Sequence, residues 1–221
     1  QREVAPQEEL NPSDLRAQRL QKLQALRDAG VDPFGARVDG LVSTESARQA
    51  YEASDKDEEN PVTARVAGRL MAKRVMGKSI FADVKDETGR LQLYIQKKTL
   101  GPDTFALFKS LDIGDIVTAE GAMFVTRMGE VSLRLESFQL LSKSLRALPE
   151  KWHGLTDVEQ RYRQRYLDLI SNDEVRDLFR MRCQIIHSLR RYLDERGFLE
   201  METPMMQALA GGAAARPFKT F

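Results

Sequence analysis

The sequence predicts an α+β protein that is mostly β: an N-terminal helix, a five-stranded barrel, and a helical segment after it. Between residues 62 and 143, apolar and polar residues alternate in short stretches, which is the period of a half-buried strand. On either side of this region, apolar residues recur every three or four positions, as in amphipathic helices. The order β-β-β-α-β-β within about 80 residues is that of an OB-fold, a five-stranded, partly open Greek-key barrel.

The composition excludes several classes of protein. Hydrophobic residues make up 42% and charged residues 30% of the 221 residues, and the net charge is +1, which excludes a low-hydrophobicity disordered chain. No stretch approaches the roughly 18 uninterrupted apolar residues of a membrane span, and residues 1–10 do not resemble a secretory signal. A single cysteine, Cys183, excludes a disulfide framework and is typical of a reducing compartment, so we expect a cytoplasmic protein.

Residues 1–61 are expected to form an amphipathic helix and a linker. The run from Asn11 to Asp14 has the capping side chain, the proline and the acid of a helix start, and Gly30 is the expected end. The face opposite the leucines carries Arg16, Arg19, Lys22 and Arg27. This basic face is either an ordinary solvated surface or a surface that contacts a polyanion.

The second and third predicted strands place an aromatic side chain on the outside of the barrel. If Ile80 points into the barrel, Phe81 points outward, because side chains alternate along a strand. On the next strand Gln92 and Tyr94 are in the outward set. A nucleobase could then stack on Phe81 for about 1–3 kcal/mol while Gln92 hydrogen-bonds to its edge.

The charge of this region differs from that of the whole chain. Residues 68–98 contain eight basic and three acidic residues, a local charge of +5, which suits a phosphate backbone. The alternative is structural: Phe81 covers an edge of the barrel or packs under the N-terminal helix. Both interpretations remain open on the pattern alone.

Three other motifs are weaker. Residues 72–79 match a relaxed P-loop, but a strand follows them where a P-loop needs a helix, so a hairpin turn is favoured. Cys183 and His187 lie four residues apart, a spacing that suits a metal pair or a nucleophile and its base, but without a third partner we expect core or edge positions. Residues 161–166 hold three arginines and two tyrosines, either as a solvated helix face or as a contact surface.

The C-terminal part is expected to be helical. Residues 144–170 form an interdomain linker with a short helix over 162–169. Ser171 and Glu174 have the spacing of a capping box that starts a long helix, and Gly197 is its expected end. We expect a short strand over residues 198–201 and a small-residue loop over 210–215.

Five runs of the sequence are characteristic of one family: VAGRLMAKRVMGKSIFADVKD, GRLQLYIQ, LLSKSLRALPEKWHGLTDVEQRYRQRYLDLI, RGFLEMETPMM and GGAAARPFKT. In these runs, and over essentially everything after about residue 10, the chain resembles the N-terminal portion of a bacterial class II lysyl-tRNA synthetase. The resemblance implies that residues 62–143 form an anticodon-binding OB-fold domain. It also implies that residues 171–221 begin the antiparallel α/β catalytic domain of a class II synthetase.

The resemblance also implies roles for single residues. Phe81 and Gln92 correspond to the aromatic ring and the amide that recognise the central anticodon uridine, with basic residues nearby at Arg74 and Arg69. Motif 1, which builds the dimer interface of the family, is represented by Gly197, Phe198 and Pro204. The loop whose backbone lies against the substrate lysine is represented by Gly211, Gly212 and Ala213. The family usually has an acid near position 137, where this chain has Ser137 beside Glu136, which leaves that anticodon contact open.

The activity implied is that of a lysine–tRNA ligase of protein biosynthesis. It uses ATP and Mg²⁺ to form lysyl-adenylate, transfers lysine to tRNA-Lys, and works as a cytoplasmic homodimer. Motifs 2 and 3 of the family do not occur before Phe221, so we expect no catalytic residue, metal site or ATP site in this chain and no activity from it alone. The alternative is a non-catalytic OB-fold fragment that binds tRNA or single-stranded nucleic acid. We also expect the apolar stripe within residues 160–221 to drive self-association of the motif 1 type.

Overall fold

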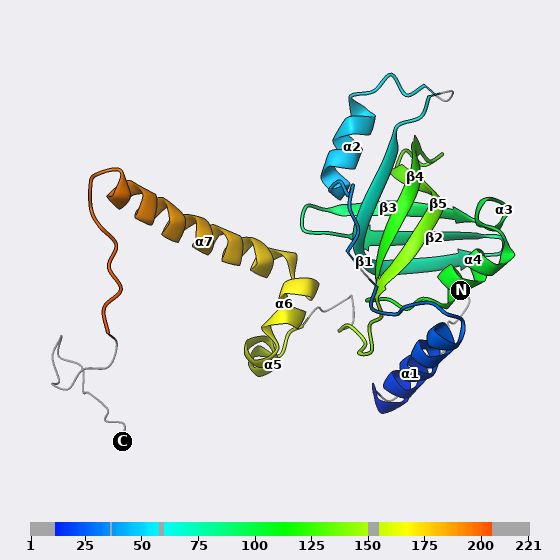
Figure 1. The fold of residues 1–221 in the computed structure, drawn as a ribbon, viewed down its shortest axis with the longest axis horizontal. Coiled ribbons are helices and arrows are strands. Elements are labelled where there is room, and N and C mark those ends of the chain that lie inside the picture. Colours follow the sequence, from blue (N-terminus) through cyan, green and yellow to red (C-terminus); the bar gives the residue numbers. More distant parts are fainter. Residues whose placement is uncertain (1–11, 36, 58–59, 150–154, 205–221) are drawn as a thin grey trace, which may run out of the picture. The chain divides into compact units, whose positions relative to one another are not determined.

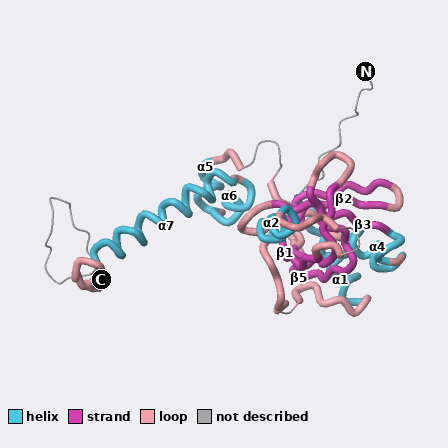
Figure 2. The backbone as a smooth tube through the Cα atoms, turned by 90° about the horizontal axis from the view of Figure 1, so that it is seen from above, coloured by secondary structure: helices cyan, strands magenta, loops and turns pink. Residues whose placement is uncertain are grey.

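The computed structural model describes residues 12–35, 37–57, 60–149 and 155–204. The chain divides into two compact units, Gln1–Leu148 and Pro149–Phe221, and each is described by itself (Figure 1). Every strand of the described residues lies in the first unit, and the second unit is helical (Figure 2). No helix in the described ranges combines the length and the apolar character needed to cross a membrane.

The first unit is built on a closed five-stranded barrel with the strand order β1-β2-β3-β5-β4. The five strands predicted from alternation are all present: β1 Thr63–Met76, β2 Ser79–Lys85, β3 Arg90–Gln96, β4 Ile116–Val125 and β5 Val131–Ser142. Neighbouring strands pair antiparallel except β3 and β5, which are parallel. Pairing of β1 with β4 closes the barrel, and the five-stranded barrel predicted from the sequence is confirmed.

The alternation in the strands places one set of side chains in the barrel core. Ile80, Leu93 and Leu133 are completely buried there, because every second residue of a strand faces inward. Two helices connect β3 to β4: α3 Lys97–Leu100, which the sequence did not predict, and α4 Pro102–Ser110. Helix α4 contributes the buried ring of Phe108, which makes an edge contact with the ring of Phe138 at a centroid distance of 4.9 Å. Apolar burial of this kind is the main stabilising contribution to the unit.

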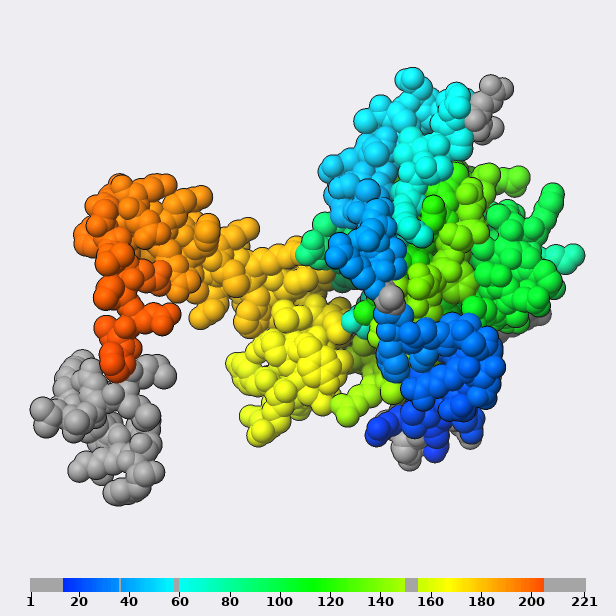
Figure 3. All heavy atoms as spheres, viewed as in Figure 1, coloured from blue at the N-terminus to red at the C-terminus, as the bar shows by residue number. Residues whose placement is uncertain are grey.

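The N-terminal helix α1, Pro12–Asp28, lies against the barrel (Figure 3). Two residues of its basic face, Arg19 and Lys22, make hydrogen bonds there. The Arg19 guanidinium donates hydrogen bonds to the carbonyl oxygens of Ile113 (3.1 Å), Ser144 (3.1 Å) and Arg146 (2.8 Å). Lys22 Nζ donates to Asp112 at 2.5 Å. These two cations therefore bind the barrel, a role that neither interpretation of the basic face had foreseen.

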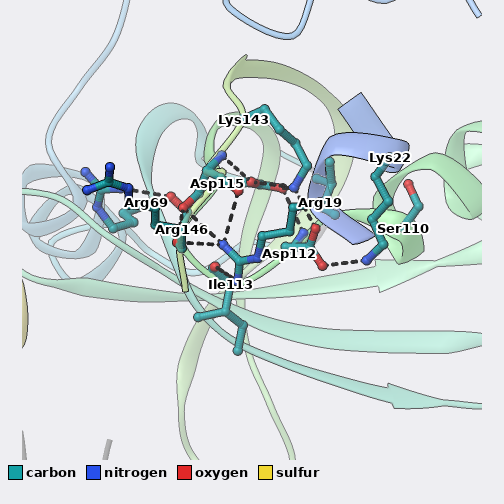
Figure 4. Close-up of polar contacts among 12 residues, drawn as sticks. Arg19, Lys22, Arg69, Ser110, Asp112, Ile113, Asp115, Lys143 and Arg146 are labelled. Atoms are coloured by element: carbon teal, nitrogen blue, oxygen red, sulfur yellow. Dashed lines mark hydrogen bonds and ion pairs between the residues drawn. The ribbon is translucent and has the colours of Figure 1, made fainter. Parts of the chain in front are cut away.

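Next to α1 lies a cluster of buried charges, shown in Figure 4. Asp115 is completely buried, and Lys143 Nζ lies 2.9 Å from its Oδ1 and 2.6 Å from Asp112 Oδ2. Burial by itself would raise the pKa of Asp112, but the hydrogen bonds from Lys143 and Lys22 outweigh it and lower that pKa. Burial lowers the pKa of Lys73 to about 8, and its ammonium donates to the carbonyl oxygens of Lys109 and Leu111.

Helix α2, Thr44–Glu52, is held at the β2–β3 turn by hydrogen bonds to Asp86 and Thr88. Asp86 accepts hydrogen bonds from the backbone N–H of Thr44 (2.7 Å), from the Thr44 hydroxyl (2.8 Å), and from the backbone N–H groups of Thr88 (2.7 Å) and Gly89 (2.9 Å). Burial would raise the pKa of Asp86, but the hydrogen bonds from Thr44, Gly89 and Thr88 lower it to about 2.

This arrangement predicts an acid dependence of stability. The pKa of Asp86 is depressed in the folded chain, so its contribution is complete above the ordinary value of 3.8 and is lost as the pH falls through about 2. We expect the free energy of unfolding to fall more steeply for the unchanged chain than for Asp86→Asn between about pH 5 and about pH 2. The difference should be about 1 kcal/mol after allowance for solvent screening. Urea denaturation at several pH values measures it, and parallel pH profiles would contradict the expectation.

The second unit contains α5 Val158–Arg163, α6 Arg165–Ser171 and α7 Asp173–Asp194. Asp168 of α6 is completely buried, and it accepts hydrogen bonds from Arg161 (3.0 Å), Arg165 and Asn172 (2.6 Å). Burial would raise the pKa of Asp168, but these partners lower it. Two of the three arginines between residues 161 and 166 therefore bind this carboxylate, so they are not simply solvated.

Four expectations for this part of the chain were wrong. The single short helix over 162–169 is two helices, which meet at Gln164. The capping box does not form, because Ser171 ends α6 and Asn172 occupies the cap position with its amide directed to Asp168 and Leu155. Residues 198–201 form no strand. Cys183 and His187 lie on exposed surface of α7, away from any core.

Candidate nucleic-acid interface

The outer wall of the barrel carries three neighbouring aromatic rings. The Phe81 ring of β2 lies 4.9 Å, centroid to centroid, from the Tyr94 ring of β3, with 30° between the ring planes. The Tyr94 ring lies 5.8 Å from the Phe124 ring of β4. All three are half-buried, while the residues on either side of Phe81 in β2 are buried in the core. Phe81 thus points out of the barrel, and part of its ring faces solvent.

Cationic side chains surround these rings. The Arg134 guanidinium of β5 lies 4.9 Å from the centroid of the Phe124 ring, within cation–π range. Arg74 of β1 is exposed, and its Cα pairs with that of Phe81 across the β1–β2 ladder. The turns beside these strands add two exposed cations, Lys78 and Arg127. Among the described residues, none of these four cations has a salt-bridge partner, which leaves their charge available to an anion.

The amide of Gln92 lies next to this aromatic surface. Its Oε1 accepts a hydrogen bond from the Ser132 hydroxyl at 3.0 Å, and its Nε2 donates to Glu130 Oε2 at 3.2 Å. Gln92 lies two positions before Tyr94 on β3, so the two side chains share a face of the strand. The Cα of Gln92 pairs with that of Asp83 on β2, which is two residues from Phe81. The structure therefore brings Phe81, Gln92 and Arg74 to one wall of the barrel.

Arg69 lies apart from this group. Its Cα pairs with that of Lys85, which is four residues from Phe81 along β2. The guanidinium donates to the carbonyl oxygen of Gly114 at 2.8 Å, and burial lowers the pKa of Arg69. This hydrogen bond connects β1 to the loop that precedes β4. The structure therefore does not bring Arg69 together with the Phe81 ring and the Gln92 amide.

Sequence reasoning missed several residues of this surface. Phe124 and Arg134 belong to strands that were predicted, but their outward position was not drawn from the pattern. In β5 the alternation was available, because Arg134 stands between the buried Leu133 and Leu135. The hydrogen-bond partners of the Gln92 amide, Glu130 and Ser132, come from the β4–β5 hairpin and from β5. They reach Gln92 because β3 and β5 pair in parallel, and this pairing cannot be predicted from the local sequence.

The residues expected in motif 1 follow α7, which ends at Asp194. Gly197 has a φ of 79°, the left-handed conformation that ends a helix without steric cost for glycine. Phe198 and Pro204 are exposed. Helix α7 also exposes a row of apolar side chains, which comprises Leu178, Met181, Ile185, Leu189 and Tyr192. The expected substrate loop, Gly211, Gly212 and Ala213, lies outside the described residues.

Two protein-family models match the chain, one in each unit. Residues 64–141 match the family model described as OB-fold nucleic acid binding domain. Residues 157–221 match the model described as tRNA synthetases class II (D, K and N).

Similar curated proteins carry the name lysine–tRNA ligase. The protein from Halalkalibacterium halodurans is 52% identical over 215 residues, which are 96% of this chain and 43% of that protein. The one from Pelotomaculum thermopropionicum is 51% identical over 214 residues, 97% of this chain and 41% of that protein. The one from Moorella thermoacetica is 51% identical over 208 residues, 94% and 42% of the respective chains. The chain thus spans about two fifths of the length of these relatives. It belongs to the class II lysyl-tRNA synthetase family and corresponds to the N-terminal portion of its members.

Proposed function

We propose that the barrel binds the anticodon loop of tRNA-Lys as the recognition domain of a lysine–tRNA ligase. The observation that carries this proposal is the half-exposed Phe81 ring, paired with Tyr94 and placed beside the Gln92 amide on the outer barrel wall. An unpaired base can stack on such a ring while an amide hydrogen-bonds to its edge, which is how single-stranded RNA is commonly recognised. Strands 2 and 3 and the flanking hairpins are also the usual binding surface of an OB-fold.

The exposed cations support the same assignment. Arg74, Lys78, Arg127 and Arg134 lie on the strands and turns around the rings. They would neutralise phosphates of a bound loop, and the resulting affinity would fall with salt because counterions are released on binding. Arg69 stays in the proposal only as a more distant cation, since its guanidinium already binds Gly114.

For the whole protein we propose the ligase reaction itself: lysine and ATP form lysyl-adenylate with Mg²⁺, and the lysyl group passes to tRNA-Lys. The compartment proposed is the cytoplasm, and the assembly proposed is a homodimer. Gly197, Phe198 and Pro204 are proposed to belong to its interface, which the exposed apolar row of α7 supports. Residues 211–213 are proposed to contact the substrate lysine.

The ATP and Mg²⁺ chemistry is not assigned to residues of this chain. Within the described ranges, no three His, Cys, Asp or Glu side chains are grouped so that they could hold a metal ion. In the proposal, the barrel residues of this chain bind and position the anticodon loop.

Phe81→Ala tests the anticodon assignment. We expect it to weaken binding of an RNA stem-loop with a uridine-rich anticodon by about 1–3 kcal/mol, because a stacking surface for one base is lost. Fluorescence anisotropy with the full chain measures the dissociation constant. Phe34→Ala, which removes an exposed ring outside the barrel strands, is the matched control and should leave binding unchanged.

Two results would count against the proposal. One is unchanged affinity of the Phe81→Ala chain for the uridine-rich stem-loop. The other is an equal loss of affinity for stem-loops that lack uridine in the anticodon, which would instead indicate an OB-fold that binds single strands without anticodon preference.

A further inference from the structure

We infer that Arg19 of helix α1 is a positioning residue that holds residues 144–146, where the chain leaves the barrel, against the rest of the first unit. The free part of the connection between the two units then begins only after Arg146. The inference goes beyond the proposed function, because it concerns contacts within the first unit and holds whatever the barrel binds.

The Arg19 guanidinium joins the loop before β4 to the segment after β5. Its Nη2 donates a hydrogen bond to the carbonyl oxygen of Ile113 at 3.1 Å. Its Nη1 donates to the carbonyl oxygens of Ser144 at 3.1 Å and Arg146 at 2.8 Å (Figure 4). A planar guanidinium carries its donors in a fixed fork, so one side chain can hold carbonyl groups of two segments at once.

The chain has other anchors as far as Ser144. The backbone N–H of Lys143 donates to the carbonyl oxygen of Pro33 at 2.8 Å, and the backbone N–H of Ser144 donates to Asp115 Oδ1 at 2.8 Å. The Lys143 side chain is itself buried between carboxylates. Residues 143 and 144 are therefore fixed to the barrel without help from α1.

Beyond Ser144 the chain depends on α1. The carbonyl oxygen of Arg146 accepts hydrogen bonds from Arg19 and, at 2.9 Å, from the nearby Ser144 hydroxyl. Arg146 and Ala147 are both exposed. Among the hydrogen bonds of the described residues, the one from Arg19 is the bond that ties Arg146 to a part of the chain outside residues 143–149.

Helix α1 is fixed to the unit independently of Arg19. Leu23 and Leu26 are buried, and Leu26 belongs to the apolar core that the barrel residues form. Lys22 Nζ lies 2.5 Å from Asp112 Oδ1. Replacing Arg19 therefore leaves the helix attached and removes only its hold on the segment after β5.

This hold sets the length of the free connection. Release of residues 145–148 would add about 13 Å of extended chain, at about 3.3 Å per residue. The length and stiffness of a connection determine the effective concentration at which one unit meets a ligand held by the other. Arg19 thus shortens the connection while lying outside it in the sequence.

Proteolysis after Arg146 tests the inference, because the carbonyl group that a protease attacks there is the one that Arg19 holds. The full chain is treated with an arginine-specific protease, and mass spectrometry follows the initial rate of each cut. We expect Arg19→Met to raise the rate after Arg146 about tenfold or more, because loss of charged hydrogen bonds raises the population of the open segment. Arg16→Met, which removes an exposed cation of the same helix, is the matched control and should leave the rate unchanged.

The pattern of cuts separates positioning from a general loss of stability. Cleavage after Arg134, inside β5, reports opening of the barrel, and cleavage after the exposed Arg196 of the second unit is the internal reference. Positioning by Arg19 predicts a faster cut after Arg146 alone. An unchanged rate after Arg146 would overturn the inference. An equal rise after Arg134 and Arg146 would also overturn it, because Arg19 would then only stabilise the barrel.

A second measurement reports on the connection itself. Spin labels are attached to the exposed Cys183 of α7, the single cysteine of the sequence, and to a second cysteine introduced by Lys98→Cys on α3. Electron paramagnetic resonance gives the distribution of distances between the two labels. We expect Arg19→Met to broaden this distribution and Arg16→Met to leave it unchanged; equal widths in all chains would overturn the inference. Neither experiment contains RNA, so both outcomes are independent of the proposed function.

Discussion

Lys143→Met should lower the free energy of unfolding of the barrel by about 3–5 kcal/mol. The Lys143 ammonium lies between Asp115, which has no exposed surface, and Asp112. Removing the ammonium leaves two neighbouring carboxylates without their main cation. At least one of them must then become protonated or draw in water, and both outcomes cost stability.

Hydrogen exchange of the buried amides of β3 and β4 measures this effect, because it reports opening of the barrel separately from the helical unit. Lys98→Met, which removes an exposed lysine of α3, is the matched control and should change the opening free energy by less than about 0.5 kcal/mol. Similar losses in the two variants would show that the buried cluster contributes little.

Gly121→Ala should destabilise the barrel by about 3 kcal/mol and weaken RNA binding at the same time. A Cβ at this position would lie 1.9 Å from the carbonyl oxygen and 2.9 Å from the carbonyl carbon of Arg134, so the backbone must move. The site coincides with a shift in the β4–β5 register between Glu120 and Gly121. Moving the Arg134 backbone also displaces the guanidinium from the Phe124 ring.

Amide exchange and stem-loop affinity of the Gly121→Ala chain measure the two effects. Gly89→Ala is a fair control, because the nearest atom to its added Cβ is the Thr44 hydroxyl oxygen at 3.5 Å, an ordinary contact. If the Gly121→Ala chain had the same free energy of unfolding as the unchanged chain, β4 and β5 could move apart at this point without loss of stability, which would contradict the prediction.

The barrel was predictable because its signal is local. Each strand alternates buried and exposed residues along its own length, and the inward-facing residues include completely buried ones such as Ile80 and Leu93. The same alternation predicted that Phe81 points outward, and the structure confirms this direction. Whether Phe81 and Gln92 contact RNA stays a prediction, since it concerns a ligand.

The failures concern interactions between residues far apart in the chain. Arg19 and Lys22 were taken for a free basic face, but their partners lie about 90 or more positions later in the sequence. The cap expected at Ser171 was lost because Asn172 and its neighbours satisfy the buried Asp168. Helix α3 has no buried residue and so leaves no periodic signal. A strand needs a pairing partner, and residues 198–201 have none among the described residues.

The parallel pairing of β3 with β5 also bears on how the protein emerges during synthesis. Translation delivers Phe81, Gln92 and Tyr94 first, but Ser132 and Arg134 arrive with β5, the last of the five barrel strands in chain order. Domains fold as units as they are synthesised from the N-terminus. A nascent chain interrupted before β5 therefore possesses the stacking rings of β2 and β3 without the hydroxyl and the guanidinium that complete their surroundings. The proposed binding surface is therefore complete only once β5 has paired with β3.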